Sequence, residues 1–334
     1  MAVKSHFSDS QGRLPDGKTQ RMKLTIVADA LTKSFHNAAA NQDGKLADYI
    51  PELAKVNPNY FSATIVNAHG ESFSVGDKDQ LFSLQSTSKP IVYSLALKQH
   101  GAEYVHSKVG VEPTGEAFNS IIELEKHSHR PFNPMINSGA IATTSLISGD
   151  NGVSKLQAIV NYISELAGRP LSIDSAIFKS ERETAHRNRA IAHLMKHFNV
   201  MTSEIDETLD NYFNQCSILV TTQDLAMIAA SMATQGRQPL TNKQLMTPNH
   251  VTKTLSLMFT CGMYDTAGEW AFKVGLPAKS GVSGAIFVVV PGKFGLAVYS
   301  PKVDDHGHSV RGRLLVENLV HELGLNIFNL GTIQ

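Results

Sequence analysis

The chain has 334 residues, of which 42% are hydrophobic and 18% are charged, and its 30 Lys and Arg residues balance 30 Asp and Glu residues. This composition is typical of a folded globular protein and argues against a disordered or fibrous chain. Because the formal net charge is zero, no overall field attracts nucleic acid or an anionic membrane, and we expect a small neutral or zwitterionic substrate.

The two cysteines, Cys216 and Cys261, are too few for a disulfide framework and do not match a spaced zinc motif. The N-terminal residues 1–22 are polar and lack the apolar core of a signal peptide. No apolar run approaches the roughly 20 residues that cross a bilayer. We therefore expect a cytoplasmic protein that does not bind a membrane, with a flexible polar arm over residues 1–22.

The first strong pattern after this arm is a β-hairpin. Residues 61–66 are mostly apolar, residues 67–70 form a turn sequence, and residues 72–75 alternate polar and apolar side chains. The next pattern is an apolar helical run over residues 91–97, for which Gly101 supplies a stop.

Two more helices are predicted in the middle of the chain. Residues 156–167 have helical apolar spacing and end at Gly168. Residues 221–224 (Thr-Thr-Gln-Asp) resemble a capping box ahead of a helix over 225–233, which ends at Gly236.

The C-terminal part predicts a second hairpin and a last helix. Residues 285–290 and 294–299 are apolar strands on either side of a Pro-Gly-Lys turn. Residues 312–326 space their apolar side chains as an amphipathic helix that would cover a sheet. One sheet that takes strands from both ends of the chain is the simplest arrangement of these elements.

We therefore predict an α/β fold of the α+β kind, in which an antiparallel sheet flanked by helices is joined to a mostly helical subdomain. Residues 23–84 and 270–334 would form a discontinuous α/β subdomain. Residues 85–269 would form the helical subdomain, and the active site would lie between the two.

The stretch SLQSTSKP, residues 83–90, holds the candidate nucleophile. Proline is accepted in a helix only within its first turn, so Pro90 places the helix start close to Ser86. A serine there has an unpaired backbone N–H at the positive end of the helix dipole, which suits the stabilisation of an oxyanion. Lys89 lies three residues on, about 5–6 Å away at Cβ on the same helix face.

Ser-x-x-Lys pairs a hydroxyl with an amine, but it also occurs by chance as a capping serine and a solvated lysine. To act as a base, Lys89 needs its pKa lowered by ~3 units from about 10.4, which burial could provide. A second motif favours catalysis, because Lys279-Ser280-Gly281 directly precedes the C-terminal hairpin. The serine β-lactamase and penicillin-binding fold carries such a strand there, whose backbone near Val282 would be a second oxyanion donor.

Longer motifs resemble a more specific family, the serine-dependent glutaminases of bacteria and of the animal kidney type. The resemblance covers the chain from about residue 25 to near its end. The motifs are LADYIPELAK (46–55), FSLQSTSKP (82–90), RPFNPMINSGAI (130–141), KSERETAHRN (179–188), NYFNQCS (211–217), TLSLMFTCGMYD (254–265) and GLPAKSGVSG (275–284).

This resemblance implies an amidohydrolase that converts L-glutamine to L-glutamate and ammonia on a β-lactamase/DD-peptidase-like fold. It makes Ser86 the nucleophile, Lys89 the proton acceptor and Tyr264 a proton shuttle, with the backbone N–H groups of Ser86 and Val282 as the oxyanion hole. The implied substrate-binding residues are Tyr49, Gln85, Asn137, Glu181, Asn188, Tyr212, Tyr264 and Val282. Relatives form dimers and tetramers, so a homodimer or homotetramer is expected.

The residue types suit glutamine independently of the family. Its ammonium, carboxylate and carboxamide need one anion and several neutral donors, and Glu181 would face the α-ammonium. Without the motifs, the same side chains would be assigned to the core, to helix caps or to the surface. Whether Lys89 or Tyr264 is the acting base stays open.

Other patterns favour no cofactor or metal. His193 and His197 lie four residues apart on a probable helix, but no third ligand is evident. Residues 304–308 (Asp-Asp-His-Gly-His) are interpreted as a solvated turn. No glycine pattern matches a nucleotide-binding loop. Two alternatives to a glutaminase remain: a serine β-lactamase or DD-peptidase-like acyl hydrolase, and a non-catalytic glutamine-binding sensor. The first alternative is disfavoured because this sequence has no Ser-Asp-Asn element and no predicted secretion signal.

Overall fold

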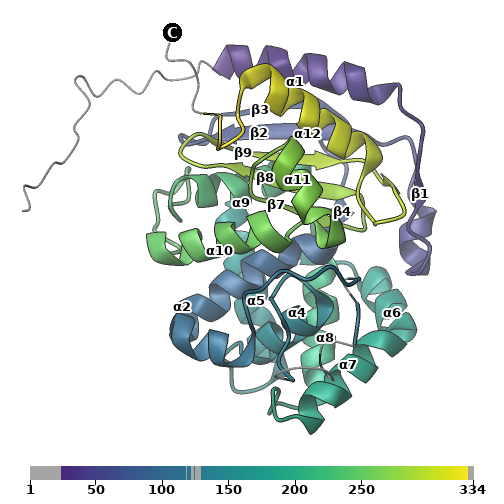
Figure 1. The fold of residues 1–334 in the computed structure, drawn as a ribbon, viewed down its shortest axis with the longest axis vertical. Helices are drawn as coiled ribbons and strands as arrows, with labels where there is room; N and C mark the ends of the chain where they lie inside the picture. The colour runs from purple at the N-terminus through teal and green to yellow at the C-terminus, as the bar shows by residue number, and fades with distance from the viewer. Residues whose placement is uncertain (1–23, 118, 122–123, 125–128, 330–334) are drawn as a thin grey trace, which may run out of the picture.

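A computed structural model describes residues 24–117, 119–121, 124 and 129–329. The expected arm over residues 1–22 lies outside the described residues. The chain forms a sheet layer covered by helices and, beneath it in Figure 1, a group of helices. Across the described residues, no helix combines the length and apolar character needed to cross a membrane.

The central sheet has five antiparallel strands in the order β3-β2-β9-β8-β7. Its strands come from both ends of the chain, as predicted: β2 (Ser62–Asn67), β3 (Ser72–Gly76), β7 (Ala278–Gly281), β8 (Ala285–Val290) and β9 (Phe294–Tyr299). The pairing of β2 with β9 joins the two predicted hairpins, for example at Ile65 and Leu296. The predicted fold class is therefore confirmed.

Both faces of the sheet are covered, which explains why β8 is apolar along its whole length. Ile286, Val288 and Val290 pack on one face with α1 (Leu24–Ala39) and α12 (Val310–Leu323). Phe287 and Val289 alternate with them and pack on the other face against α9 (Thr222–Ala233).

Helix α9 lies directly on β9 because Gly295 carries no side chain. A Cβ at Gly295 would lie 2.2 Å from the Ala230 nitrogen and 2.4 Å from the Ala226 carbonyl oxygen. The predicted capping box starts this helix, with the Thr221 side chain accepting from the Asp224 N–H. Helix α9 falls within residues 85–269, which were predicted to form the helical subdomain, yet it packs on the sheet. The division into subdomains at residues 84 and 269 therefore stays a prediction.

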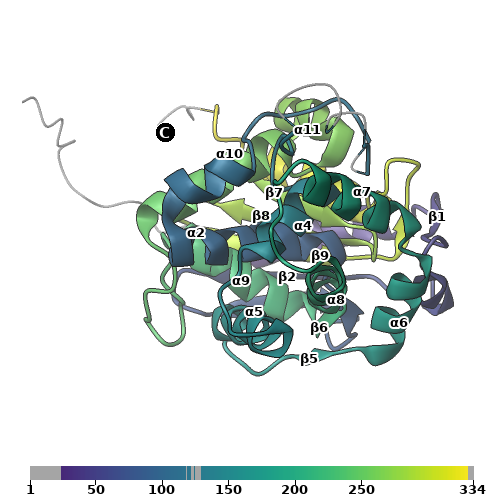
Figure 2. The ribbon, with the colours of Figure 1, turned by 90° about the horizontal axis from the view of Figure 1, so that it is seen from below.

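A group of helices packs below the sheet layer in Figure 1. Figure 2 shows α4 surrounded by α2, α7 and α8. Their bounds are α2 Ser88–Lys108, α4 Asn137–Ser145, α5 Gly152–Ala167, α6 Ser175–Thr184, α7 His186–His197, α8 Ile205–Cys216, α10 Pro248–Cys261 and α11 Ala267–Lys273. Short elements are β1 Lys45–Leu46, β4 Phe82–Ser83, β5 Ser172–Ile173, β6 Ile218–Val220, β10 Lys302–Val303 and the 3₁₀ turns η1 Pro51–Lys55, η2 Gln85–Thr87 and η3 Tyr264–Thr266.

The predicted helices at residues 156–167 and 312–326 are confirmed as α5 and α12, and both end at a left-handed glycine, Gly168 and Gly324. The predicted stop at Gly101 agrees with the backbone. This glycine has φ of 76° and ψ of 163°, so the helix that begins at Ser88 is interrupted there, and a second helical segment follows it to Lys108. Both segments are counted in α2, with a kink at Gly101.

Candidate active site

Ser86 lies in the 3₁₀ turn η2, immediately before α2. The strand before it is anchored to β6, because the Leu84 N–H donates to the Ile218 carbonyl over 2.9 Å. Gln85 has φ of 47°, a left-handed conformation that costs energy for a residue with a side chain. The predicted helix start near Ser86 is therefore correct to within one turn.

Strand β7 passes close to this turn through the glycine of the Lys-Ser-Gly motif. A Cβ at Gly281 would lie 3.0 Å from the Leu84 carbonyl oxygen and 3.5 Å from the Ser86 nitrogen. Glycine therefore lets the β7 backbone approach Ser86. Val282 follows directly and is 4% exposed.

Lys89 is buried, with 1% of its surface exposed. Its Nζ donates to Asn137 Oδ1 over 2.7 Å, and the Asn137 amide donates in turn to Asn188 Oδ1 over 2.9 Å. Burial lowers the pKa of Lys89 to about 8, although the nearby Glu181 carboxylate opposes this. The lysine can therefore be neutral at mildly alkaline pH, as a general base requires.

Tyr264 reaches Ser86 from η3. Its hydroxyl hydrogen-bonds with Ser86 and donates to the Ser280 carbonyl over 3.3 Å. Burial raises the pKa of Tyr264 to about 12, and these hydrogen bonds oppose the increase. The phenol therefore keeps its proton near neutral pH. Lys279 lies against it, with its Nζ 4.1 Å from the centre of the Tyr264 ring.

A cavity of about 90 Å³ opens in front of Ser86. Six of the predicted substrate-binding residues line it: Tyr49, Gln85, Asn137, Glu181, Asn188 and Tyr212. Tyr264 and Val282 do not line it, and Tyr264 reaches it only through Ser86. Tyr49 is 51% exposed, yet its hydroxyl end lies inside, where burial raises its pKa well above the usual value. A larger groove of about 580 Å³ lies beside α5, away from these groups.

Glu181 supplies the carboxylate of the cavity and is 7% exposed. Gln85 Nε2 lies 3.5 Å from Glu181 Oε2. Burial raises the pKa of Glu181 to about 8, while the hydrogen bond from Gln85 and the charge of Lys89 act to lower it. A bound cation would remove most of the cost of ionising this carboxyl group.

Comparison with known proteins identifies the family. A model of the family described as Glutaminase matches residues 44–328.

The chain belongs to the glutaminase family.

Curated relatives agree along almost the whole chain. The chain is 50% identical over 305 residues to a glutaminase of Trichormus variabilis, covering 91% of this chain and 90% of the relative. It is 51% identical over 287 residues to a glutaminase of Nostoc, covering 86% of each.

Solved structures of this family share the fold. The structure titled probable glutaminase ybaS matches with a TM-score of 0.89 at 39% identity, covering 91% of this chain and 98% of that one. A probable glutaminase from Bacillus subtilis, complexed with 6-diazo-5-oxo-L-norleucine, matches with a TM-score of 0.81 at 35% identity, covering 91% and 96%.

Two parts of this glutaminase site were missed by the sequence patterns. Cys216 lines the cavity, and its thiol hydrogen-bonds with Glu181 and Tyr212. Its position four residues after Tyr212 on α8, hence on the same face, was the available signal. Further lining residues without a predicted role are Ile50, Asn119, Thr184, Ala185 and Arg187.

The interpretation of residues 304–308 as a solvated turn is wrong for His308. Its side chain is 0% exposed and hydrogen-bonds with Ser280 and Thr266, whereas His306 is exposed. His193 and His197 are both exposed on α7. Within the described ranges, no group of three His, Cys, Asp or Glu side chains could hold a metal ion.

Proposed function

We propose that the chain hydrolyses L-glutamine to L-glutamate and ammonia through a glutamyl ester on Ser86. The observation that carries this proposal is the placement of Ser86 between Tyr264, to which it is hydrogen-bonded, and a cavity with one carboxylate and several neutral amide and hydroxyl groups. A buried lysine, Lys89, whose pKa is lowered to about 8, lies three residues on, in the first turn of α2.

In the first half of the reaction, Ser86 Oγ attacks the side-chain carbonyl carbon of glutamine. The serine proton is taken up by the Lys89 and Tyr264 pair and is then given to the departing nitrogen, so ammonia leaves and an ester remains. The developing oxyanion would be stabilised by the N–H groups of Ser86 and Val282. The close approach of β7 at Gly281 supports this second donor.

In the second half, water replaces ammonia. The same pair accepts a proton from the water as it attacks the ester carbonyl, and then returns a proton to Ser86 Oγ as glutamate leaves. No net proton or electron is gained by the chain over one cycle. The narrow cavity of about 90 Å³ suits a free amino acid better than a peptide or a β-lactam.

The cavity also matches the two ends of the amino acid. Glu181 would pair with the α-ammonium, and the amide and hydroxyl groups of Asn188 and Tyr212 would hold the polar remainder. A cavity that hydrogen-bonds each polar end rejects analogues that lack one, because buried partners are then left unpaired.

Replacing Glu181 with glutamine should raise the KM for L-glutamine by about 30-fold or more, equivalent to about 2 kcal/mol or more, because a buried ion pair with the ammonium is lost. Steady-state kinetics with glutamine and with 4-carbamoylbutanoate, which lacks the amino group, would measure this. The wild type should strongly prefer glutamine, and the variant should lose most of that preference.

The matched control is Glu183→Gln, on the same helix but exposed. Its KM should stay within about twofold, since surface charges contribute little. An unchanged preference in Glu181→Gln would remove the carboxylate from substrate recognition.

The function itself is tested by ammonia release from L-glutamine and L-asparagine, measured beside turnover of a chromogenic cephalosporin. We expect ammonia from glutamine and no cephalosporin turnover. The reverse outcome would favour a β-lactamase or DD-peptidase. Tight glutamine binding in a calorimeter without any ammonia would favour a sensor.

We also propose that the protein is cytoplasmic and assembles as a homodimer or homotetramer. Light scattering on the purified chain would test the assembly, and a monomer would contradict it. Cell fractionation would test the location.

A further inference from the structure

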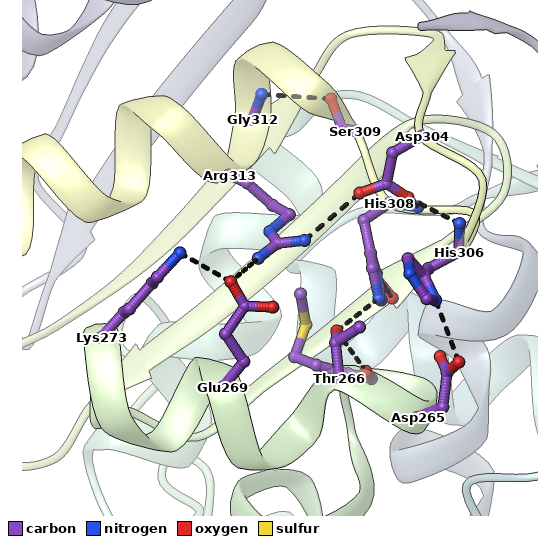
Figure 3. A network of polar contacts seen from close by, with 12 residues as sticks. Asp265, Thr266, Glu269, Lys273, Asp304, His306, His308, Ser309, Gly312 and Arg313 are labelled. Carbon is purple, nitrogen blue, oxygen red and sulfur yellow. Dashed lines mark hydrogen bonds and ion pairs between the residues drawn. The ribbon is translucent and has the colours of Figure 1, made fainter. Parts of the chain in front are cut away.

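The loop between β10 and α12 buries a histidine next to the catalytic groups. The His308 N–H donates to Asp304 Oδ1 and the Asp304 N–H donates to the His308 carbonyl, each over 2.9 Å, so the turn is closed by its own bonds. Asp305 and His306 at its tip are exposed, but the His308 ring points inward toward Thr266, as Figure 3 shows.

Both ring nitrogens of His308 are hydrogen-bonded. Nδ1 lies 2.9 Å from Ser280 Oγ, and Nε2 lies 2.9 Å from Thr266 Oγ1. The Thr266 hydroxyl donates to the Met263 carbonyl over 3.0 Å, so its oxygen accepts from an Nε2–H. In a neutral ring, Nδ1 then carries no hydrogen and accepts from the Ser280 hydroxyl. The two contacts therefore fit a neutral ring in the Nε2–H tautomer.

The surroundings keep this ring neutral. Burial lowers the pKa of His308 to about 3; the nearby Lys279 and Arg313 lower it further, while Asp304 and Asp265 oppose the decrease. The imidazole therefore stays neutral near neutral pH, and its two hydrogen bonds are to Ser280 and Thr266. Any contribution of His308 to the reaction therefore comes from the positions in which it holds Ser280 and Thr266.

The partner that it faces is Tyr264. The two rings stack with centroids 5.0 Å apart and an interplanar angle of 23°. Tyr264 has φ of 49°, a left-handed conformation that persists only where the surroundings hold it. A Cβ at Gly307 would lie 3.7 Å from Tyr264 Cε2 and 3.4 Å from Val282 Cγ1, so the loop packs on Tyr264 and on Val282, the residue after β7, together.

The loop is in turn attached to its neighbours by ion pairs. Asp304 pairs with Arg313 of α12 over 3.2 Å, and Arg313 pairs with Glu269 of α11 over 3.3 Å. His306 Nδ1 is also hydrogen-bonded with Asp265, the residue after Tyr264, over 2.9 Å. Figure 3 shows how these contacts link the three segments around His308. Each of these partly exposed contacts contributes little alone, but together they restrain the loop.

We propose that His308 is a positioning residue for the hydrolysis. It bridges Ser280 on β7 and Thr266, two residues after Tyr264, and so keeps the Tyr264 hydroxyl in hydrogen-bonding position beside Ser86. Ser280 connects His308 to the catalytic groups. Its carbonyl oxygen accepts from the Tyr264 hydroxyl over 3.3 Å and from Lys279 Nζ over 2.9 Å. The inference rests on the proposed reaction at Ser86.

Three variants test it. His308→Leu keeps much of the volume but removes both bonds, His308→Asn retains an amide near the position of Nδ1, and His308→Gln retains one near Nε2. We expect kcat to fall by at least tenfold in His308→Leu and by less in the two amide variants. Calorimetric binding of L-glutamate should stay within twofold of the wild type, because the cavity contacts lie on the other side of Ser86.

The control in the same loop is Asp305→Asn, an exposed position at the tip, for which kcat within threefold of the wild type is expected. Circular dichroism and thermal unfolding give the folded fraction of each variant, to which kcat is normalised. A folded His308→Leu variant with wild-type kcat would overturn the proposal, as would parallel losses of kcat and glutamate binding, which indicate general disruption. If the wild type releases no ammonia from glutamine, the reaction itself fails before any variant is compared.

Discussion

Replacing Ser86 with alanine should abolish ammonia release from glutamine, with a loss on the order of 10⁶-fold in kcat, as expected when a covalent nucleophile is removed. The fold should survive, because the change deletes one hydroxyl at the edge of a cavity and leaves the apolar contacts of η2 and α2 in place. The measurement is single-turnover and steady-state ammonia release, with unfolding midpoints compared at the same pH.

A second measurement distinguishes loss of the Ser86 hydroxyl from disruption of the whole substrate cavity. The diazoketone 6-diazo-5-oxo-L-norleucine, with which a Bacillus subtilis relative was complexed, should add covalently to the wild type with loss of dinitrogen. Mass spectrometry should find that adduct on the peptide containing Ser86 and none in Ser86→Ala. Glutamate should still bind to the variant.

The matched control is Ser88→Ala, two residues on. The Ser88 hydroxyl is buried and donates to the Gln85 carbonyl over 2.8 Å. The same hydroxyl oxygen also accepts from Gln215 Nε2 over 3.5 Å. Loss of the hydroxyl should lower kcat by less than about tenfold, because these bonds are structural and each contributes only about 1 kcal/mol to stability. Comparable losses in both variants, or full activity in Ser86→Ala, would contradict the assignment of Ser86.

The elements that could be predicted from sequence are those with a local physical cause. Apolar alternation and turn residues were enough for both hairpins, and capping residues were enough for α9. The helix start at Ser86 followed from Pro90 alone, since proline is restricted to the first turn. Gly101 interrupts the helix where the sequence predicted a stop, and what the local pattern did not predict is the second helical segment that follows to Lys108.

The parts of the site that were missed depend on contacts between distant segments. His308 lies in a polar pentapeptide that resembles a surface turn, and its partners Ser280 and Thr266 are 28 and 42 residues away. Tyr264 was placed beside Ser86 by the family resemblance, because no periodicity or spacing connects η3 with η2. Sequence patterns assign polar side chains to the surface, so they do not predict which polar side chains are buried.

The rate constant kcat/KM should rise with pH, and the rise should identify which of Lys89 and Tyr264 is the acting base. A base must be unprotonated in the free enzyme. Lys89, with its pKa lowered to about 8 by burial, meets this condition at mildly alkaline pH, whereas Tyr264, with its pKa raised to about 12, keeps its proton. We therefore expect Lys89 to be the acceptor and Tyr264 to hold and relay the Ser86 proton.

The sign of the pH effect follows. Below pH 8 the neutral fraction of Lys89 falls about tenfold per pH unit, so kcat/KM should rise with pH and level off above about 8. Glu181, whose pKa burial raises to about 8, must ionise to pair with the ammonium and would add to the same rise. The two groups are coupled, so the wild-type profile reports the pair and not one residue.

The variants separate the two contributions. In Glu181→Gln the rise should remain, now set by Lys89 alone. In Tyr264→Phe it should remain with a plateau lower by about 10²- to 10⁴-fold, the usual worth of a positioned proton-transfer group. Lys89→Ala should lose at least as much and no longer show the rise set by the lysine, while small primary amines that can enter the vacated space should restore part of the rate in proportion to their basicity. An unchanged pH rise in Lys89→Ala, with no rescue by amines, would instead make the tyrosine the base and require its pKa to fall when glutamine binds.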